Sequence, residues 1–313
     1  MPSLVGSEMC IRDRQGDFGE SLLSGEPVLE TIARVFPNTL FIVVYGVLLS
    51  VLIGVPLGIL ASSRPNSRLD GSIMGVSSLG VAVPNFWLGM VLVSVFALGW
   101  NWFPATGFTP PGESLSSAIW FATLPAIALC TNGIAEVTRQ LRSSLVEIHG
   151  SQYVRTLHAK GLSPAVILWK HGLKNVSVNL LTVISLLFNK ALAATVVVET
   201  VFAIPGMGNT IVKAVLESDF PVVQGAVLAM VVTVILVNLL TDLLDHAKLA
   251  EGKFTISPAP CKLRYSIDGA VRLHAGAARA DDVKIVTRIS PDLPVWVQLD
   301  GLRLRQILSN LLS

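Results

Sequence analysis

The sequence predicts an all-α protein that crosses a membrane several times. Hydrophobic residues make up 52% of its 313 residues and charged residues only 14%, against roughly 25% charged residues in soluble domains. Five apolar runs are long enough to cross the hydrocarbon core of a bilayer, which takes roughly 20 helical residues. Buried helices of a soluble core are a poor alternative, because five such runs leave too little polar surface. The five predicted spans cover about residues 36–60, 74–100, 118–134, 176–204 and 222–240.

Basic residues between the predicted spans indicate their orientation. The connection after the first span carries Arg64 and Arg68, the one after the second has no Lys or Arg, and the one after the fourth has only Lys213. The connection after the third span, about 139–175, is the most basic. Because Lys and Arg are enriched on the cytoplasmic side of membranes, we expect the first and third connections to face the cytoplasm.

Net charge and cysteine spacing limit the function classes. The formal net charge of +2 gives no indication of a nucleic-acid partner. The three cysteines form no CxxC or similar spacing, so we predict neither a disulfide framework nor a metal site.

The basic connection has the pattern of two short helices joined by a tight turn. Ser151 is suited to cap the start of the first helix, and Gly161 supplies the left-handed residue that ends it after about Lys160. Ser163 followed by Pro164 repeats the start signal, since proline is favoured at the first helical position.

The first of these helices has a face that suggests a protein partner. Tyr153 and Leu157 share that face at i,i+4 spacing, with Arg155 and His158 beside it. A helix of about ten residues is marginal alone in water, so we expect it to pack against other groups. Attraction of the basic residues to anionic membrane lipid is a simpler role for the segment, but it requires neither the turn nor this face.

Several motifs in a fixed order resemble one family. They are YVRT, AKGLS and KHGLKN in the basic connection, with GDFGES, FPNTL, PNFWLGM, VVVETVFAIPGMG and DFPVVQGAVL elsewhere. Over about residues 16–244 the chain resembles permease subunits of binding-protein-dependent ABC importers, most closely the dipeptide, oligopeptide and nickel class. The resemblance implies that the basic connection is a coupling loop that docks on a cytoplasmic ATPase. The residues that it assigns to coupling are Tyr153, Arg155, His158, Ala159, Lys160 and Gly161.

The resemblance also implies partners, cofactors and a location. The expected partners are a second permease subunit, two ATPase subunits and an extracytoplasmic solute-binding protein, in the cytoplasmic membrane of a bacterium or archaeon. No GxxxxGK[ST] phosphate loop occurs in the sequence, so we expect ATP and magnesium to be bound by the ATPase subunits and this chain not to be an enzyme. The implied solutes are di- or oligopeptides or similar small molecules.

Polar residues in the fourth predicted span are candidates for the solute path. Lys190, beside Asn189, lies near the middle of this span, where a charge costs about 2.5–3.5 kcal/mol on insertion scales. Lys190 therefore either lines a cavity, pairs with a neighbouring helix or lies nearer the surface than the predicted boundaries suggest. Glu136, at the end of the third span, is expected at the inner interface.

The segment after the fourth span carries the candidates for the binding-protein side. They are Glu199, Pro205, Gly206 and Gly208, in the motif that leads outward in the resembled family. Pro205 and the two glycines break a helix, so we expect an outer loop or short re-entrant helix over about 204–221.

Both ends of the chain depart from the resembled family. Residues 1–15 resemble a translated sequencing adapter and stand where the family has its first membrane helix, so we expect a non-native or disordered segment there and five spans instead of six. Residues 245–313 resemble a truncated sensor histidine kinase, with strands near 283–288 and 295–299 and a helix from about Leu302. We expect an incomplete α/β fragment in a chimeric chain. The alternative function is a membrane sensor with a degenerate kinase output, but no histidine stands in a phosphoacceptor setting.

Overall fold

The computed structural model describes residues 18–250, 259–264, 267, 286–287, 290, 294, 296–299 and 304. The chain divides into two compact units, Met1–Leu243 and Leu244–Ser313. The N-terminal segment 1–15 lies outside the described residues, and the predicted domain boundaries at 15 and 244 stay predictions.

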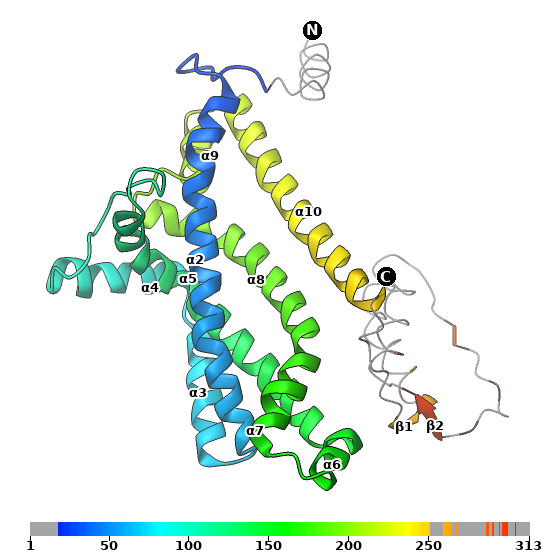
Figure 1. The fold of residues 1–313 in the computed structure, drawn as a ribbon. Helices are drawn as coiled ribbons and strands as arrows, with labels where there is room; N and C mark the ends of the chain where they lie inside the picture. The colour runs from blue at the N-terminus through cyan, green and yellow to red at the C-terminus, as the bar shows by residue number, and fades with distance from the viewer. Residues whose placement is uncertain are drawn as a thin grey trace. The chain divides into compact units, whose positions relative to one another are not determined.

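Long helices α2 (Val28–Ser63) and α5 (Leu115–His149) form the centre of the first unit (Figure 1). They approach closely because glycines of α2 face larger side chains of α5 along the contact. A Cβ added at Gly54 would lie 2.8 Å from Cβ of Val137, and one at Gly58 would lie 3.0 Å from Cβ of Leu141. Small residues at such positions are typical of helices that pack inside membranes.

The second predicted span is broken, which corrects the single helix expected over 74–100. Helix α3 (Arg68–Ala82) ends at Val83, and α4 (Asn85–Leu92) continues into the π-helix η1 (Val93–Gly99). The two halves are bent by 94°. Pro84, the residue between them, accounts for the break because proline has no backbone N–H and disfavours helical geometry in the residue before it.

The remaining helices follow the predicted order. Helix α8 (Leu173–Val201) is the fourth predicted span, and α10 (Phe220–Ala250) contains the fifth. Between them lies the short helix α9 (Met207–Leu216), which confirms a short helix within 204–221. Within the described residues, four helices are long and apolar enough to cross a membrane, and the bent pair makes a fifth when it is counted as one broken span.

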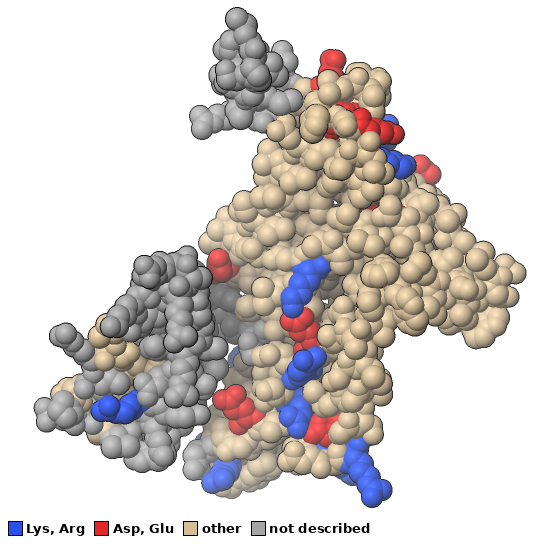
Figure 2. Space-filling model, turned by 180° about the vertical axis from the view of Figure 1, so that it is seen from behind, with Lys and Arg blue, Asp and Glu red and all other residues tan. Residues whose placement is uncertain are grey.

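The arrangement in space separates two ends of the helical unit. The basic turn between α2 and α3 lies at the same end as the short helices α6 (Gln152–Ala159) and α7 (Pro164–Val166), while α9 lies at the opposite end beside the start of α2 (Figure 1). On the face shown in Figure 2, charged side chains gather at one end and in a column along the other half, and wide uncharged areas lie between them. The two most basic connections therefore share one end, as the orientation inferred from Lys and Arg requires.

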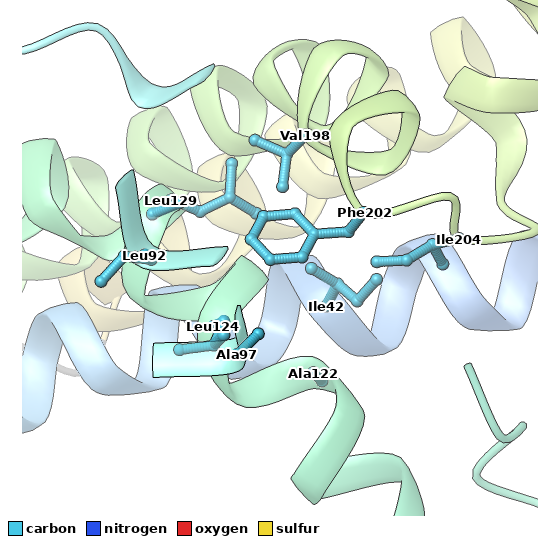
Figure 3. Close-up of a cluster of buried hydrophobic side chains, with 10 residues drawn as sticks. Ile42, Leu92, Ala97, Ala122, Leu124, Leu129, Val198, Phe202 and Ile204 are labelled. Atoms are coloured by element: carbon cyan, nitrogen blue, oxygen red, sulfur yellow. The ribbon is translucent and has the colours of Figure 1, made fainter. Parts of the chain in front are cut away.

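The main apolar core lies where α2, α5, η1 and the end of α8 meet. Phe202, 2% exposed, has its ring among side chains that come from several helices (Figure 3). Gly89 of α4 approaches the same ring, since a Cβ there would lie 3.1 Å from it. The buried members of this core are Ile42, Leu92, Ala97, Ala122, Leu124, Ala128, Leu129, Val198, Phe202 and Ile204.

The second unit is described only in part. Strand β1 (Ala259–Lys262) pairs antiparallel with β2 (Trp296–Leu299). The strand predicted near 295–299 is thus confirmed, whereas β1 was not predicted. Of the strand predicted at 283–288 only Val286 and Thr287 are described, in no regular element, and Leu304 alone represents the predicted helix.

Candidate functional site

The basic connection forms the predicted pair of short helices. Ser151 caps α6, because its side chain accepts a hydrogen bond from the backbone N–H of Val154. Gly161 ends the turn with φ +80°, the left-handed conformation that favours glycine. Ser163 caps α7 in the same way, with Pro164 at the first helical position. From α7 the chain passes through the π-helix η2 (Ile167–Gly172) directly into α8.

One face of α6 is buried within the connection itself. Val154 and Leu157 are 2% and 8% exposed, and they pack against Ile167 of η2. The sequence spacing placed Tyr153 and Leu157 on one shared face, but only Leu157 is buried. Leu157 points inward, and Tyr153 lies at the surface, where its Oη is 2.8 Å from Nδ1 of His171.

The opposite face of α6 is polar and exposed. Arg155 and Ala159 each lie two residues from Leu157, about 200° around the helix axis, so they face away from the small core. The exposed residues of α6 and of the turn after it include two cations, one histidine and two small residues. The small residues leave the backbone of the turn accessible. These five residues are Arg155, His158, Ala159, Lys160 and Gly161.

The predicted path residues Asn189 and Lys190 point to different helices. The side-chain amide of Asn189 donates to Oδ1 of Asn238 on α10, at 2.8 Å. Nζ of Lys190 lies 2.9 Å and 2.8 Å from the two carboxylate oxygens of Glu136 on α5. Of the alternatives for Lys190, pairing with a neighbouring helix is therefore observed, and Glu136 lies beside the fourth span.

Glu199 lies at the end of α8 and is fully buried. Its Oε1 accepts a hydrogen bond from Oγ1 of Thr39 at 2.6 Å, and its Oε2 accepts one from the backbone N–H of Asn209 at 3.1 Å. Oγ1 of Thr39 in turn accepts from the backbone N–H of Met207, at 2.7 Å. The carboxylate thus receives donors at the N-terminus of α9, where negative charge is favoured.

The residues around Glu199 explain the glycines of the motif. A side chain at Gly206 would overlap the Glu199 carboxylate, and one at Gly208 would overlap the backbone of Val196. The carbonyl of Pro205 accepts a hydrogen bond from the side chain of Asn38, at 2.8 Å. Glu199, Pro205, Gly206 and Gly208 therefore fix the loop between α8 and α9, and their proximity to a binding protein stays a prediction.

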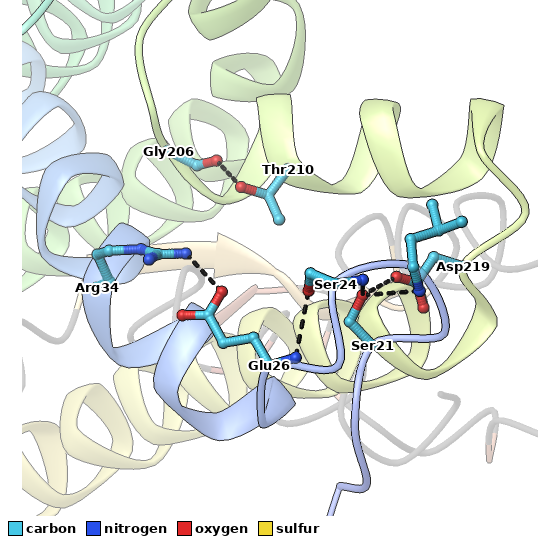
Figure 4. Close-up of polar contacts among 8 residues, drawn as sticks. Ser21, Ser24, Glu26, Arg34, Gly206, Thr210 and Asp219 are labelled. Atoms are coloured by element: carbon cyan, nitrogen blue, oxygen red, sulfur yellow. Dashed lines mark hydrogen bonds and ion pairs between the residues drawn. The ribbon is translucent and has the colours of Figure 1, made fainter.

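A second polar cluster joins the start of the chain's described part to the α9–α10 junction. Asp219 accepts hydrogen bonds from Oγ of Ser21 and from the backbone N–H of Leu22. Beside it, Arg34 pairs with Glu26 at 3.0 Å (Figure 4). These contacts hold residues 21–26 against α2 and the α9–α10 junction, at the end of the bundle opposite to α6.

Comparison with known proteins places the helical unit in a family. The model of the family described as "Binding-protein-dependent transport system inner membrane component" matches residues 54–247. The chain belongs to this family. It is 35% identical over 233 residues to the oligopeptide transport system permease protein AppB of Bacillus subtilis (strain 168), with 74% of each chain covered. It is also 35% identical over 252 residues to the dipeptide transport system permease protein DppB of Escherichia coli (strain K12), with 73% of this chain and 74% of that protein covered.

The fold agrees with this assignment. The structure resembles a chain of the inward-facing MetNI methionine ABC transporter, with a TM-score of 0.58 at 17% identity over 70% of this chain and 96% of that one. The protein is thus a permease subunit of an ABC importer and a multi-pass protein of the cytoplasmic membrane. As a transporter component it is not itself an enzyme. The sensor alternative is not supported, because the matching relatives are permeases.

Sequence reasoning missed the partners of three charged residues. Glu136 and Glu199 were recognised, but no spacing linked them to Lys190 or to the start of α9. Arg142 of α5 makes two hydrogen bonds, at 2.9 and 2.6 Å, to the carboxylate of Asp70 on α3. The side chain of Asp70 is only 5% exposed. Its position in the first turn of a helix, after Ser67, was the only feature of the sequence that indicated a structural role for it. Among the described residues no group of three or more His, Cys, Asp or Glu forms a metal site.

Proposed function

We propose that the protein carries di- or oligopeptides across the membrane as one of two permease subunits, driven by two cytoplasmic ATPase subunits and supplied by an extracytoplasmic binding protein. The relatives named for oligopeptide and dipeptide transport support the solute class. ATP and magnesium are held by the ATPase subunits in this scheme.

The coupling role rests on the construction of α6. Val154 and Leu157 pack one face of this helix against Ile167 of η2 and Ile148 of α5, while Arg155 and Lys160 remain exposed. A helix held in this way moves with the bundle, so a force applied to its exposed face reaches α5 and α8 directly. Arginine and lysine at this face suit acidic groups in a groove of the ATPase.

The transport cycle follows from differential binding. Closure of the ATPase dimer on ATP displaces α6, and the bundle changes from inward to outward opening. ATP shifts the equilibrium toward the closed ATPase dimer only because it binds the closed state more tightly than the open state. Release of the hydrolysis products returns the bundle to the inward-open state.

Cysteine cross-linking tests the docking of α6. An Ala159→Cys variant should form a disulfide with a single-cysteine ATPase subunit whose cysteine lies in its docking groove, because position 159 is exposed beside the turn. Thr210→Cys, on α9 at the opposite end of the bundle, is the control and should form none. An Ala159→Cys variant that cross-links no more than this control would refute docking by α6.

A further inference from the structure

The ion pair between Lys190 and Glu136 lies within the apolar part of the bundle. By the 1.5 Å rise of a helix, Lys190 is about 16 Å before the end of α8 at Val201. Charged groups at such depth face a water-filled cavity or other protein, since lipid does not accommodate them. The pair joins α8 to α5, the two helices that flank the coupling connection.

This pair is open, unlike the other ion pair of α5. The side chains of Lys190 and Glu136 are 63% and 35% exposed. The Arg142–Asp70 pair is 25% and 5% exposed and is bidentate. The covered pair fastens α3 to α5, whereas the Lys190–Glu136 pair is accessible to a further partner that displaces the contact between its two charges.

The polar stripe continues along α5. Asn132 lies one turn before Glu136, on the same face of the helix. Its Nδ2 donates to Oδ1 of Asn85 on α4 at 2.9 Å, and its own Oδ1 has no hydrogen-bond partner among the described residues. Three helices thus contribute polar groups to one line, as a path for a polar solute requires.

We propose that Lys190 and Glu136 bind the charged termini of a peptide in the path, with the carboxylate at Lys190 and the ammonium group at Glu136. This inference rests on the proposed peptide transport. Charge-assisted hydrogen bonds of this kind are about twice as strong as neutral ones. A solute that carries both charges replaces the ion pair without leaving either residue unpaired inside the membrane.

The geometry requires the pair to separate. An extended dipeptide is about 7 Å long, whereas Nζ and the carboxylate of the pair are 2.8 Å apart. The flexible four-carbon stem of lysine permits this movement. A peptide that binds both residues therefore has to separate the ion pair.

Uptake of capped peptides tests this site. Lys190→Met and Glu136→Gln variants, in the complex with unchanged partner subunits, are supplied with dialanine, dialanine amide and N-acetyl-dialanine. The ratio of variant to parent rate for each peptide removes the preference of the binding protein. Lys190→Met should lower uptake of dialanine about tenfold and leave uptake of dialanine amide unaffected. Glu136→Gln should likewise lower uptake of dialanine about tenfold and leave uptake of N-acetyl-dialanine unaffected.

A double variant guards against misfolding. Lys190→Met with Glu136→Met leaves no unpaired charge, and it should lower uptake of dialanine more than uptake of either capped peptide, because dialanine loses two charge contacts and each capped peptide loses one. Equal losses for all three peptides, or no loss for any, would overturn the site. If the parent complex transports none of the peptides, the proposed function itself fails, which is a different result.

Discussion

Substitution of Gly161 provides a graded test of coupling through α6. Gly161 has φ +80°, and an added Cβ would meet nothing within 4 Å, so the cost of a substitution is conformational and not steric. Alanine in a left-handed conformation costs about 1–2 kcal/mol, while asparagine tolerates it better. The expected order of transport activity is therefore glycine, asparagine, alanine and proline.

Proline at position 161 should abolish coupling. Its ring fixes φ near −65°, and it removes the N–H that Gly161 donates to the carbonyl of His158 at 2.9 Å. It also disfavours the helical geometry of Lys160, which has φ −81° and ψ 3°. A combined cost of about 3 kcal/mol or more lowers the population of the native turn by more than about 100-fold, at 1.4 kcal/mol for each tenfold change.

The assay is ATP-dependent uptake, with membrane insertion measured in the same cells. Gly161→Asn is the matched control and should retain most of the parent rate at the same level of inserted protein. Gly161→Pro should insert normally and transport nothing. Parent-level uptake by the proline variant at equal expression would refute the coupling role of the turn.

Two further substitutions test the packing that supports the loop and the bundle. Leu157→Ala removes a buried side chain of the small loop core, which should destabilise this core by about 2–5 kcal/mol and expose the basic connection to cleavage by trypsin. Val166→Ala, at a position that is 41% exposed, is the control and should not increase cleavage. Equal cleavage of both variants would contradict the role of this core. Gly54→Ala places a methyl group 2.8 Å from Cβ of Val137 and should destabilise the α2–α5 contact by about 1–3 kcal/mol, seen as earlier thermal aggregation in detergent. Gly71→Ala, with nothing within 4 Å, is its control, and equal aggregation temperatures for the two variants would argue against close α2–α5 packing.

Local signals predicted the structure of the basic connection well, because this structure depends on near neighbours in the sequence. Ser151, Gly161, Ser163 and Pro164 each determine one backbone feature, and all four act as predicted. The inward turn of Leu157 was not predictable in this way. Spacing shows that residues share a face, but only the position of Ile167 shows which face is covered.

The bend in the second span and the polar pairs depend on information that the sequence holds weakly or not at all. Pro84 was visible, but it lies inside a continuous apolar run, which favoured one long helix. The partners of Lys190 and Glu199 lie 54 and 160 residues away in the chain, on Glu136 and Thr39. Such contacts follow from the packing of whole helices, which no local spacing encodes.

ATP-driven accumulation of peptide is the most direct measurement of the central claim. The chain is reconstituted in liposomes with its partner permease and ATPase subunits, with loaded binding protein on the extracytoplasmic side and nucleotide on the other. Radiolabelled dialanine should accumulate with ATP and magnesium and should not accumulate with ADP. Equal movement of the peptide with either nucleotide, or no movement with ATP, would contradict the account of this protein as the membrane subunit of an ATP-driven peptide importer.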